Sequence, residues 1–480
     1  MMKKMKRNAW TELPPDQNEK ILGIFTRDLS FYRTFFPLLV VIALQQLTAL
    51  AVNLADNIML GTYSELALSG ATLVNQIQFT LQQISSGIGM GIVVLASQYW
   101  GRKDVKPIKK IISMGVKFGF LAGVLFFIVT IAMPENVLSL FTGDEEVIQE
   151  GMGYLRIICW TYLIYSVSSS LMYSLQSVET AVVGTVMSLS TICINVFLNY
   201  CLIYGNLGAP ELGIEGAAAA TLVSRTVELV IVFTYLLFID GKLRMKLRDI
   251  LQLDFTYFKD YIRVASPLVV SGALWGVAQA SQTSILGHIS AEAIAANSIA
   301  VIVFQIFAVA GMACANTASV TMGKTIGQGR LDRVRSYAKT MQGIFLIVGL
   351  LSAGLLFIFK DIIVGIYAVS DETAALAARF LTILSVTTVG TCYEYPVEAG
   401  IIAGGGVTKY AAWTDNLFMW LFTIPSAYLS AFFFRFPPEV TFCFLKADQI
   451  LKCIPNAIVC NRFRWVRILT RSIDKEIPEM

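Results

Sequence analysis

Charged residues are scarce in this chain. They make up 15% of its 480 residues, whereas hydrophobic residues make up 56%. A soluble domain carries about 25% charged residues, because its surface is in contact with water. A chain with so little charge lacks the polar surface that a soluble protein of this size needs. The composition therefore predicts a membrane protein that crosses the bilayer several times.

Histidine is almost absent, and paired cysteines are missing. His288 is the only histidine, so the sequence holds no histidine cluster for a metal. The eight cysteines include no C-x-x-C pair, so we expect neither a disulfide framework nor a metal site. The net charge is only +4, which argues against nucleic acid as a partner. We also expect no enzymatic activity and no cofactor, because no soluble domain is present to hold an active site.

Long hydrophobic runs are what the sequence has in excess. A helix needs about 20 apolar residues to cross a bilayer, and the run from Phe35 to Gly61 exceeds that length. Further runs lie at about 66–98, 108–132, 152–176, 181–204, 214–238, 262–286, 293–322, 333–358, 374–402, 408–434 and 439–460. We therefore expect an all-α membrane protein with about twelve transmembrane helices, surrounded by the lipid bilayer.

The basic residues are concentrated in alternate loops, at 102–110, 242–248 and 324–335. The loops between them are acidic, as in DEE (144–146) and DET (371–373). Cytoplasmic loops of membrane proteins carry the excess of Lys and Arg. We therefore expect a multi-pass protein of the inner (plasma) membrane with both termini in the cytoplasm.

The second half of the sequence repeats the first. MLGTYSELALSGA (59–71) corresponds to ILGHISAEAIAAN (285–297), ASQYWGRKD (96–104) to MGKTIGQGR (322–330), and ENVLSLFTGDEEV (135–147) to DIIVGIYAVSDET (361–373). The offset between the copies is the same in all three blocks. Each copy holds about six helices, so both enter the membrane from the same side. We expect two six-helix bundles related by a pseudo-two-fold axis along the membrane normal.

These features divide the chain into five parts. They are a cytoplasmic N-terminal lead-in (1–33), an N-lobe (34–240), a cytoplasmic linker (241–261), a C-lobe (262–462) and a cytoplasmic tail (463–480). Proteins built from such repeats bind a substrate between the two bundles and expose it to each side of the membrane in turn.

Asp56 lies deep in the first hydrophobic run, one helical turn after Asn53. A carboxylate at membrane depth is costly unless it meets water, a cation or a partner. Such an acid is typical of the coupling site of a transporter, where a cation or a proton is exchanged for substrate. The alternative is an acid at a helix end near the interface, because Gly61 follows only a few residues later.

Asn195 and Asn199 lie four residues apart in the fifth run and share one face of a helix. Amides in hydrocarbon need hydrogen-bond partners, so we expect the pair to line the N-lobe cavity and to contact Asp56. Hydrogen bonding between helices is the alternative. Arg225 and Glu228, three residues apart in the sixth run, are expected to form an internal ion pair. Direct participation in coupling is the alternative.

The C-lobe offers further cavity candidates, which are Gln279, Gln282 and Asn297. Glu394 and Glu398 lie four residues apart in the tenth run, so a regular helix would carry both carboxylates on one face. One of two close carboxylates tends to hold a proton, which suits proton exchange. The alternative is that both acids are solvated in a wet vestibule.

Five motifs, in this order, resemble those of the multidrug and toxic compound extrusion (MATE) family, and of its bacterial members in particular. They are NLADNIMLG (53–61), ASQYWGRKD (96–104), INVFLNYCLIYG (194–205), GIIAGGGVTKY (400–410) and LKADQILKCIPNAIVCNRFRW (445–465). The resemblance implies twelve helices in two lobes and export of organic, lipophilic cationic compounds in exchange for Na⁺ or H⁺. It also implies that Asp56, in the N-x-x-D pattern of the first helix, is the coupling acid. We expect the transporter to be a monomer.

The sequence departs from the family pattern at three positions. Approximate alignment puts Trp275 where one branch has an acid that helps to hold Na⁺, and Ala403 and Val407 where an Arg and an Asp are usual. These changes put the coupling ion and the efficiency of export in question.

Three alternatives stay open at this point. They are a lipid-linked oligosaccharide flippase of the same superfamily, a passive channel, and a degenerate relative that does not transport. Arg225 is the only base that we expect inside a membrane span, which disfavours the strongly basic cavity of a flippase.

Overall fold

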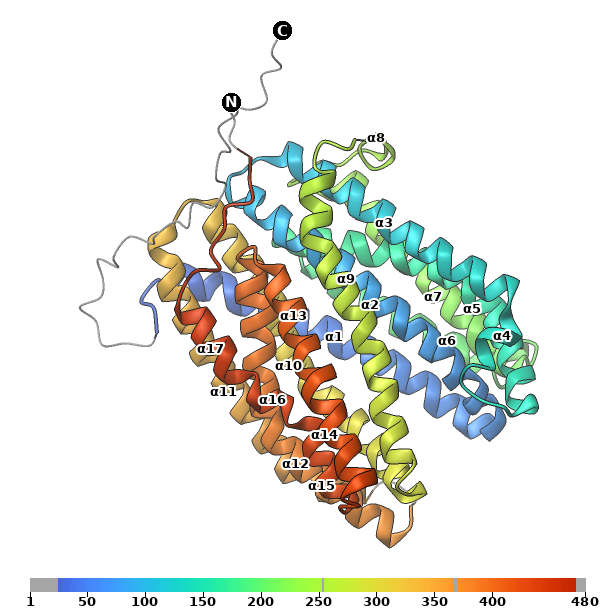
Figure 1. The fold of residues 1–480 in the computed structure, drawn as a ribbon. Coiled ribbons are helices and arrows are strands. Elements are labelled where there is room, and N and C mark those ends of the chain that lie inside the picture. The colour runs from blue at the N-terminus through green and yellow to red at the C-terminus, as the bar shows by residue number, and fades with distance from the viewer. Residues whose placement is uncertain (1–24, 253, 366–368, 472–480) are drawn as a thin grey trace, which may run out of the picture. The chain divides into compact units, whose positions relative to one another are not determined.

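The computed structural model describes residues 25–252, 254–365 and 369–471 (Figure 1). Most of the N-terminal lead-in predicted at 1–33 and the end of the tail predicted at 463–480 lie outside the described residues. The described ranges contain helices and connecting segments and no β-strand. The all-α membrane fold predicted from the sequence is confirmed.

The helices follow the hydrophobic runs. Eleven helical segments in the described ranges are long and apolar enough to cross a membrane. The first half forms α1 (Leu29–Tyr63), α2 (Glu65–Gly101), α3 (Val105–Ala132), α4 (Pro134–Leu138), α5 (Glu145–Ser177), α6 (Val182–Leu202), η1 (Asn206–Gly208), α7 (Gly213–Thr234) and η2 (Tyr235–Ile239). The second half forms α8 (Leu247–Leu251), α9 (Phe258–Gly287), α10 (Ala291–Gly327), α11 (Leu331–Val364), α12 (Asp371–Tyr395), η3 (Pro396–Ile402), α13 (Thr408–Phe418), η4 (Met419–Thr423), α14 (Ile424–Tyr428), η5 (Leu429–Phe433), α15 (Pro438–Lys446), α16 (Asp448–Leu451) and α17 (Cys453–Asn461).

The twelfth run of the sequence, at 439–460, is not one continuous helix. It is divided into α15, α16 and α17, with Ala447 and Lys452 at the two junctions. The segment contains Lys446, Asp448 and Lys452, and all three are buried within the protein. Charged side chains in a membrane-spanning segment face the protein interior because contact with lipid is costly. The interruptions of this segment thus coincide with its charges.

The helix boundaries repeat with the offset seen in the sequence. α2 and α10 are both 37 residues long. The starts of α10, α11, α12 and α13 follow those of α2, α3, α5 and α6 by the same number of residues that separates Gly61 from Gly287. Pro37 in α1 and Pro267 in α9 occupy similar places in the first helix of each copy. The halves therefore repeat one series of helices, in which the divided segment α15–α17 corresponds to α7.

The chain forms two compact units. The N-terminal unit contains residues 37–92 and 105–277, and the C-terminal unit contains the described residues of 1–36, 93–104 and 278–480. α1, α2 and α9 each contribute residues to both units. The lobes that the sequence places at 34–240 and 262–462 remain a proposal.

In the N-terminal unit, α5 packs against α3 and α7, and α6 packs against α7 (Figure 1). The close approach of α3 to α5 depends on two glycines. A Cβ at Gly119 would lie 2.7 Å from the carbonyl oxygen of Ser166, and a Cβ at Gly123 would lie 2.6 Å from that of Tyr162. The buried core of this unit includes Leu60, Leu81, Leu155, Ile158 and Ala218.

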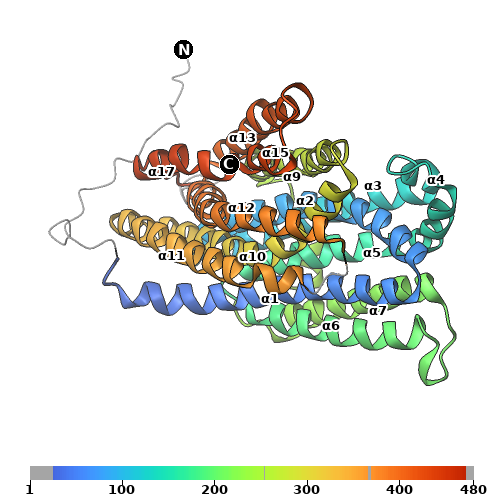
Figure 2. The same cartoon turned by 90° about the horizontal axis from the view of Figure 1, so that it is seen from below.

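In the C-terminal unit, α10, α11 and α12 pack against one another, as Figure 2 shows. The ring of Phe380 on α12 stacks on that of Phe442 on α15, with the centroids 4.1 Å apart. This contact fixes the first part of the divided segment against the helices that form the core.

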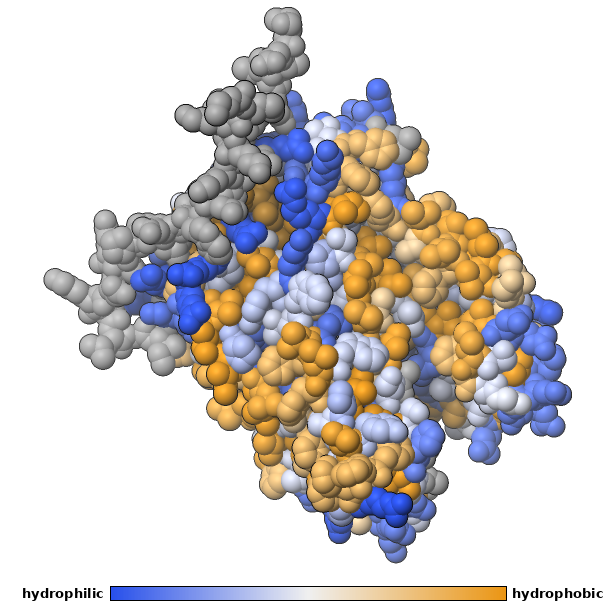
Figure 3. Space-filling model, in the orientation of Figure 1, coloured by the Kyte–Doolittle hydropathy of each residue, from blue (hydrophilic) through white to orange (hydrophobic). Residues whose placement is uncertain are grey.

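The surface of the helices is largely apolar. Figure 3 shows hydrophobic side chains spread over the helices in view, with hydrophilic ones gathered at loops such as those beside α4. The exposed large hydrophobic residues include Leu121, Leu125 and Ile128 on α3 and Leu350 and Leu351 on α11. Lipid tails are as apolar as such side chains, so this surface matches a bilayer. The protein is a multi-pass membrane protein.

The linker between the two copies is fastened to α3 in the N-terminal unit. Lys109 Nζ lies 2.8 Å from Asp249 Oδ2, and Lys110 Nζ lies 2.8 Å from Asp254 Oδ2. Lys109 Nζ also donates to the carbonyl oxygen of Arg244 at 2.8 Å. The basic start of α3 therefore binds the linker at several points.

Gly327→Ala is expected to destabilise the C-terminal unit. The end of α2 crosses α10 here, and a Cβ at Gly327 would lie 1.9 Å from the carbonyl oxygen of Gln98. Forcing extra volume into a packed contact costs about 1–3 kcal/mol. A lower thermal unfolding midpoint of the detergent-solubilised protein checks this. Gly354→Ala on α11 is the control, because its Cβ would meet no atom within 4 Å; equal losses in both variants would contradict the contact.

Lys110→Ala is expected to loosen the linker, by at most about 1 kcal/mol because the ion pair is partly exposed. Hydrogen bonds from Lys110 and Thr256 lower the pKa of Asp254 to about 2. The folded pKa is thus below the unfolded value of about 3.9. The stabilisation is therefore fully present above that unfolded value and is lost as the pH falls through about 2.

Hydrogen exchange of residues 247–257 measures this attachment. We expect faster exchange in Lys110→Ala than in the wild-type protein at pH 7, and wild-type protection that persists down to pH 5. Lys106→Ala is the matched control, because Lys106 is exposed on the same helix. The same exchange in both variants would show that the ion pair does not hold the linker.

Candidate functional site

Asp56 lies on the inward face of α1. Val52 and Leu60, one turn before and after it, are buried, and residues four apart share one face of a helix. The side chain therefore points into the N-terminal unit, where Asp56 is 8% exposed. α1 continues to Tyr63, so Asp56 is not a solvated acid at a helix end.

Asp56 is part of a closed ring of hydrogen bonds between α1, α6 and α7, which Figure 2 shows next to one another. Asn199 Nδ2 donates to Asp56 Oδ1 at 2.5 Å and lies 3.3 Å from Asn195 Oδ1. Thr221 Oγ1 donates to Asp56 Oδ2 at 3.4 Å, and Asn195 Nδ2 lies 3.2 Å from Thr221 Oγ1. The structure thus brings together Asp56, Asn195 and Asn199, and it adds Thr221.

No cation forms an ion pair with Asp56 in the described part of the chain. Arg225, one turn after Thr221 on α7, pairs instead with Glu228, with Nη1 and Oε2 2.7 Å apart. Its guanidinium lies 5.2 Å from the ring centroid of Tyr165. The ion pair predicted for Arg225 and Glu228 is confirmed. Asp56 is left with neutral donors only, and a buried charge without a counter-charge is costly. A proton or a cation from outside the chain would neutralise it.

The amide oxygen of Asn199 adds an unused acceptor to this ring. It is buried and has no hydrogen-bond partner among the described residues. Buried acceptors normally have a partner, so an orphan one in a native structure needs an explanation. A cation or a protonated group bound beside Asp56 would supply that partner.

Asn53 does not join the ring. It lies one turn before Asp56 but is exposed on α1. Its role as a cavity residue stays a prediction.

Gln282 on α9 stands at the position of the second copy that corresponds to Asp56. It is buried, its Oε1 lies 2.9 Å from Lys446 Nζ, and its Nε2 lies 3.2 Å from Met419 Sδ. Lys446 belongs to α15, in the segment that corresponds to α7. In the second copy an amide thus contacts a lysine, whereas in the first a carboxylate contacts the hydroxyl of Thr221.

Gln279 and Asn297 lie apart from this contact. Gln279 corresponds to Asn53 and is half-buried, and Asn297 is buried on α10. Neither side chain makes a hydrogen bond with another described residue. Their place in a cavity stays a prediction.

A buried cluster surrounds Lys452 in the C-terminal unit. Lys452 Nζ lies 2.8 Å from Asp415 Oδ1, 3.2 Å from Glu394 Oε1 and 3.3 Å from Asp448 Oδ2. α12, α13 and α16 supply one carboxylate each. We call these four residues the lysine cluster. One ammonium thus connects three helices through ion pairs.

Glu398 lies near the lysine cluster but has a different partner. Its Oε2 accepts a hydrogen bond from Asn456 Nδ2 at 2.7 Å, and Asn456 Oδ1 accepts one from the Tyr410 hydroxyl at 2.9 Å. The π-helical segment η3 begins at Pro396, between Glu394 and Glu398, so the two do not share the face of a regular α-helix. Both are buried, which does not fit the alternative of a wet vestibule.

Four polar residues of these networks were missed in the sequence: Thr221, Asn456, Lys446 and Lys452. The expectation that Arg225 is the only base inside a span is wrong, because Lys446 and Lys452 are buried as well. Their signal is a pair of lysines that, together with Asp448, interrupts a mostly apolar run. Thr221 and Asn456 give no such signal, because hydroxyl and amide side chains are common both in helices that carry a functional site and in helices that do not.

The structure shows where the three departures from the family pattern lie. Trp275 on α9 contacts Phe79, with the ring centroids 5.7 Å apart. Ala403 is buried at the end of η3, and Val407 directly precedes α13. None of the three has a side chain that can bind a cation through oxygen.

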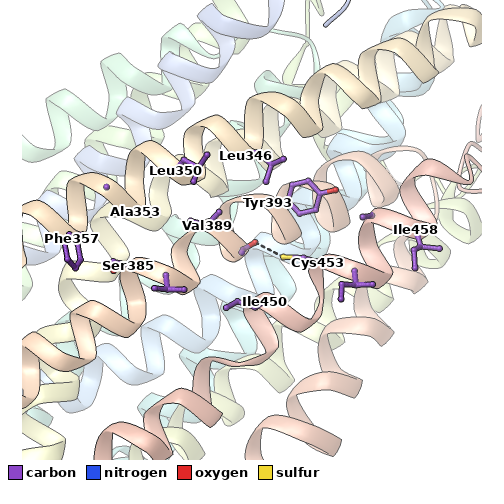
Figure 4. A pocket seen from close by; sticks show the side chains of 15 residues that line it. Leu346, Leu350, Ala353, Phe357, Ser385, Val389, Tyr393, Ile450, Cys453 and Ile458 are labelled. Atoms are coloured by element: carbon purple, nitrogen blue, oxygen red, sulfur yellow. Dashed lines mark hydrogen bonds between the residues drawn. The ribbon is translucent and has the colours of Figure 1, made fainter. Parts of the chain in front are cut away.

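A groove of about 1010 Å³ lies in the C-terminal unit between α11, α12 and the segment α16–α17 (Figure 4). Its lining is apolar apart from a few groups such as Tyr393 and Cys453. Cys453 Sγ donates to the carbonyl oxygen of Gly390 at 3.6 Å. Leu350 and Phe357, which line the groove, are more than half exposed. The groove is therefore an open surface suited to apolar chains, and it holds no group for ion exchange.

Thr221→Val is expected to lower the free energy of unfolding by about 1–3 kcal/mol, because it removes a buried donor to Asp56 and the acceptor for Asn195. The thermal unfolding midpoint in detergent measures the loss. Thr226→Val is the matched control on α7. Thr226 is exposed, and its hydroxyl donates to the carbonyl oxygen of Leu222 in its own helix at 2.8 Å. If both variants lost the same stability, the ring around Asp56 would contribute nothing.

Curated relatives cover most of the chain. A probable multidrug resistance protein NorM from Listeria innocua is 26% identical over 402 residues, which cover 83% of this chain and 87% of that protein. A protein of the same name from Thermotoga maritima is 22% identical over 431 residues, covering 88% and 91%.

Solved structures share the fold. The Vibrio cholerae MATE transporter VcmN in its bent form superposes with a TM-score of 0.80 at 17% identity, covering 91% of this chain and 99% of that one. The eukaryotic MATE transporter AtDTX14 gives a TM-score of 0.80 at 17% identity, covering 91% and 98%. The MatE family model matches residues 42–201 and 267–429, one stretch in each copy of the repeat. This chain belongs to the MatE family, the multidrug and toxic compound extrusion transporters.

Proposed function

We propose that this protein is a cation-coupled antiporter that exports small organic compounds, lipophilic cations in particular, by alternating access. Asp56 is the coupling acid, and Asn195 and Asn199 position it. The observation that carries the proposal is the ring around Asp56, which contains a buried carboxylate, neutral donors only and an unused acceptor on Asn199.

The exchange follows from the charge of one carboxylate. When a proton or Na⁺ occupies Asp56, the site is neutral and an organic cation is no longer held. When the ion leaves, the bare carboxylate again favours a cationic substrate, because a buried charge needs a counter-charge. The two ligands therefore exclude each other. A tenfold ion gradient supplies about 1.4 kcal/mol for each ion moved, which drives export against a comparable substrate gradient.

The relatives support a role in multidrug resistance, which export of small organic compounds would serve. The similar bacterial proteins are named as probable multidrug resistance proteins. For this chain we propose the same broad role: a monomer of the plasma membrane with both termini in the cytoplasm, Na⁺ or H⁺ as coupling ion, and no enzymatic step or other cofactor. Asn53, Gln279, Gln282, Asn297, Glu394 and Glu398 remain candidates for the walls of its cavity.

A lipid-linked oligosaccharide flippase is the second candidate. The burial of Lys446 and Lys452 removes one argument against it, because the spans hold more than one base. Lys452, however, is neutralised by three carboxylates and offers little charge to an anionic lipid. The family match and the NorM relatives favour the exporter.

Asp56→Asn is expected to abolish coupled efflux while leaving the protein folded. A neutral amide does not take up a proton near neutral pH, and it does not supply the negative charge that balances a bound cation. The assay measures efflux of a fluorescent dye cation from proteoliposomes, with an inward Na⁺ gradient and an inward pH gradient applied separately. We expect one gradient to drive wild-type efflux and the variant to fall to the level of empty liposomes.

Glu135→Gln is the control for this assay, because Glu135 is an exposed acid on α4. It should transport as the wild-type protein does. Full coupled efflux by Asp56→Asn would refute the role of Asp56. Equal dye leakage with and without a gradient would indicate a channel, and no flux in the wild-type protein would indicate another substrate or a relative that does not transport.

A further inference from the structure

The second copy of the repeat holds its buried charges differently from the first. In the first copy, Asp56 is a carboxylate without a cationic partner among the described residues. In the second copy, a lysine within the divided segment α15–α17 meets three carboxylates. The corresponding helix of the first copy, α7, is continuous over 22 residues. The divided segment is thus one of the places where the two copies differ in charge.

Lys452 has the contacts of a bound cation. Its side chain is 5% exposed, and each of Glu394, Asp415 and Asp448 places one oxygen within 3.3 Å of Nζ. An ammonium has three protons to donate and no acceptor, so these three oxygens match its full capacity. The ammonium therefore occupies the centre at which three carboxylates from different helices converge.

A metal cation would need the same oxygens. Hard cations take oxygen ligands, and carboxylates are prominent among them. In the described ranges, no group of three or more acidic, thiol or imidazole side chains is arranged to hold a metal ion. The ammonium is covalently part of the chain and cannot leave the cluster by diffusion. A proton differs, because it binds a single oxygen and does not displace the ammonium.

We propose that Lys452 is a tethered counter-ion that excludes Na⁺ and other metal cations from the lysine cluster, so that the C-terminal unit can take up protons but not metal ions. Lys452 would then be a residue that determines ion specificity. The titratable groups around it are Glu394, Asp415 and Asp448, with Glu398, Tyr410, Cys453 and Lys446 close by.

The cluster keeps acids that protons could neutralise. Three carboxylates surround one ammonium, and Glu398 beside them has an amide partner rather than a cation. Buried carboxylates without a counter-charge are costly, so a proton on one of them lowers that cost without any change in the ion pairs of Lys452.

Lys446 provides a matched control within the same segment. It is also a buried lysine, but its Nζ lies 2.9 Å from the amide oxygen of Gln282 and 5.6 Å from the ring centroid of Phe442. No carboxylate among the described residues lies within ion-pair distance of it. Removing this ammonium deletes a buried charge but opens no set of carboxylate oxygens.

The experiment measures stabilisation by Na⁺ in the full-length protein in detergent, comparing NaCl with choline chloride at equal ionic strength. All proteins carry Asp56→Asn, so that Na⁺ binding at the proposed coupling site does not contribute. The variants added to this background are Lys452→Gln, Lys446→Gln and the double change Lys452→Gln with Glu394→Gln. The readout is the thermal unfolding midpoint, which rises with a ligand that binds only the folded state.

We expect Lys452→Gln to gain a rise of roughly 2 °C or more in NaCl. The background protein and Lys446→Gln should show no such rise, and adding Glu394→Gln should reduce it by removing one carboxylate charge. A folded Lys452→Gln without Na⁺ dependence would overturn the proposal, as would an equal dependence in Lys446→Gln or in the background protein. These readouts need no transport, so they are independent of whether Asp56 couples export.

Lys452→Gln leaves buried carboxylates without their partner and can fail to fold. In that case Lys452→Gln with Asp415→Asn, which removes one charge of each sign, replaces it. Glu394 and Asp448 remain in this variant, so a Na⁺-dependent rise is again expected and its absence overturns the proposal. If neither variant folds in NaCl or in choline chloride, the proposal is also overturned, because Na⁺ should fill the place of the ammonium.

Discussion

The cost of placing charge in hydrocarbon is the constraint on which the rest of this structure depends. Each buried charge is therefore surrounded by a specific set of partners, and those partners fix which helices must meet. Asp56 brings α6 and α7 to α1 through amide and hydroxyl donors. Arg225 is neutralised by Glu228 on its own helix. Lys452 connects α12, α13 and α16 through carboxylates.

Buried ion pairs are weak evidence for stability, since desolvation offsets much of their attraction. Their effect is to make alternative helix packings costly, because each would leave a charge unpaired.

Duplication of the helices did not duplicate the chemistry. The helix starts repeat at one offset, yet the position of Asp56 is occupied by Gln282 in the second copy, where Lys446 is its neighbour. The first copy thus buries a carboxylate among neutral donors, whereas the second buries an amide beside a lysine. The backbone plan is thus shared, while the buried polar side chains of the two copies differ. Such divergence is possible because helix positions depend mainly on apolar packing, as in the cores around Leu155 and Phe380.

The fold was largely predictable from the sequence, and the site only in part. Apolar runs long enough to cross a bilayer and the repeat at constant offset suffice to predict the helices and their order.

The ring around Asp56 was predictable as far as Asn195 and Asn199, because a four-residue spacing puts both amides on one face of a helix. Thr221 was not, since its contact depends on how α7 rotates against α1. Glu394 and Glu398 were expected on one face of a regular helix, but the π-helical turn η3 begins between them, and the two side chains bond to different partners. The offset that relates Asp56 to Gln282 was present in the sequence and points directly to the second position. The roles of Lys446 and Lys452 depend on which side chains converge from distant segments, which periodicity does not contain.

The attachment of the linker to α3 limits how far the chain between the two copies can extend. A free chain spanning residues 241–261 would reach on the order of 60 Å when stretched. Here the linker is bound at Arg244, Asp249, Ile250 and Asp254 to lysines and a serine of α3. Only a few residues then separate the last attachment from Phe258, where α9 begins. The linker is therefore a short, bound connection rather than a flexible hinge. The first part of α9 consequently moves together with α3. Any bending of this region has to occur inside the helix itself, for which Pro267 and the uncrowded Gly276 provide the place.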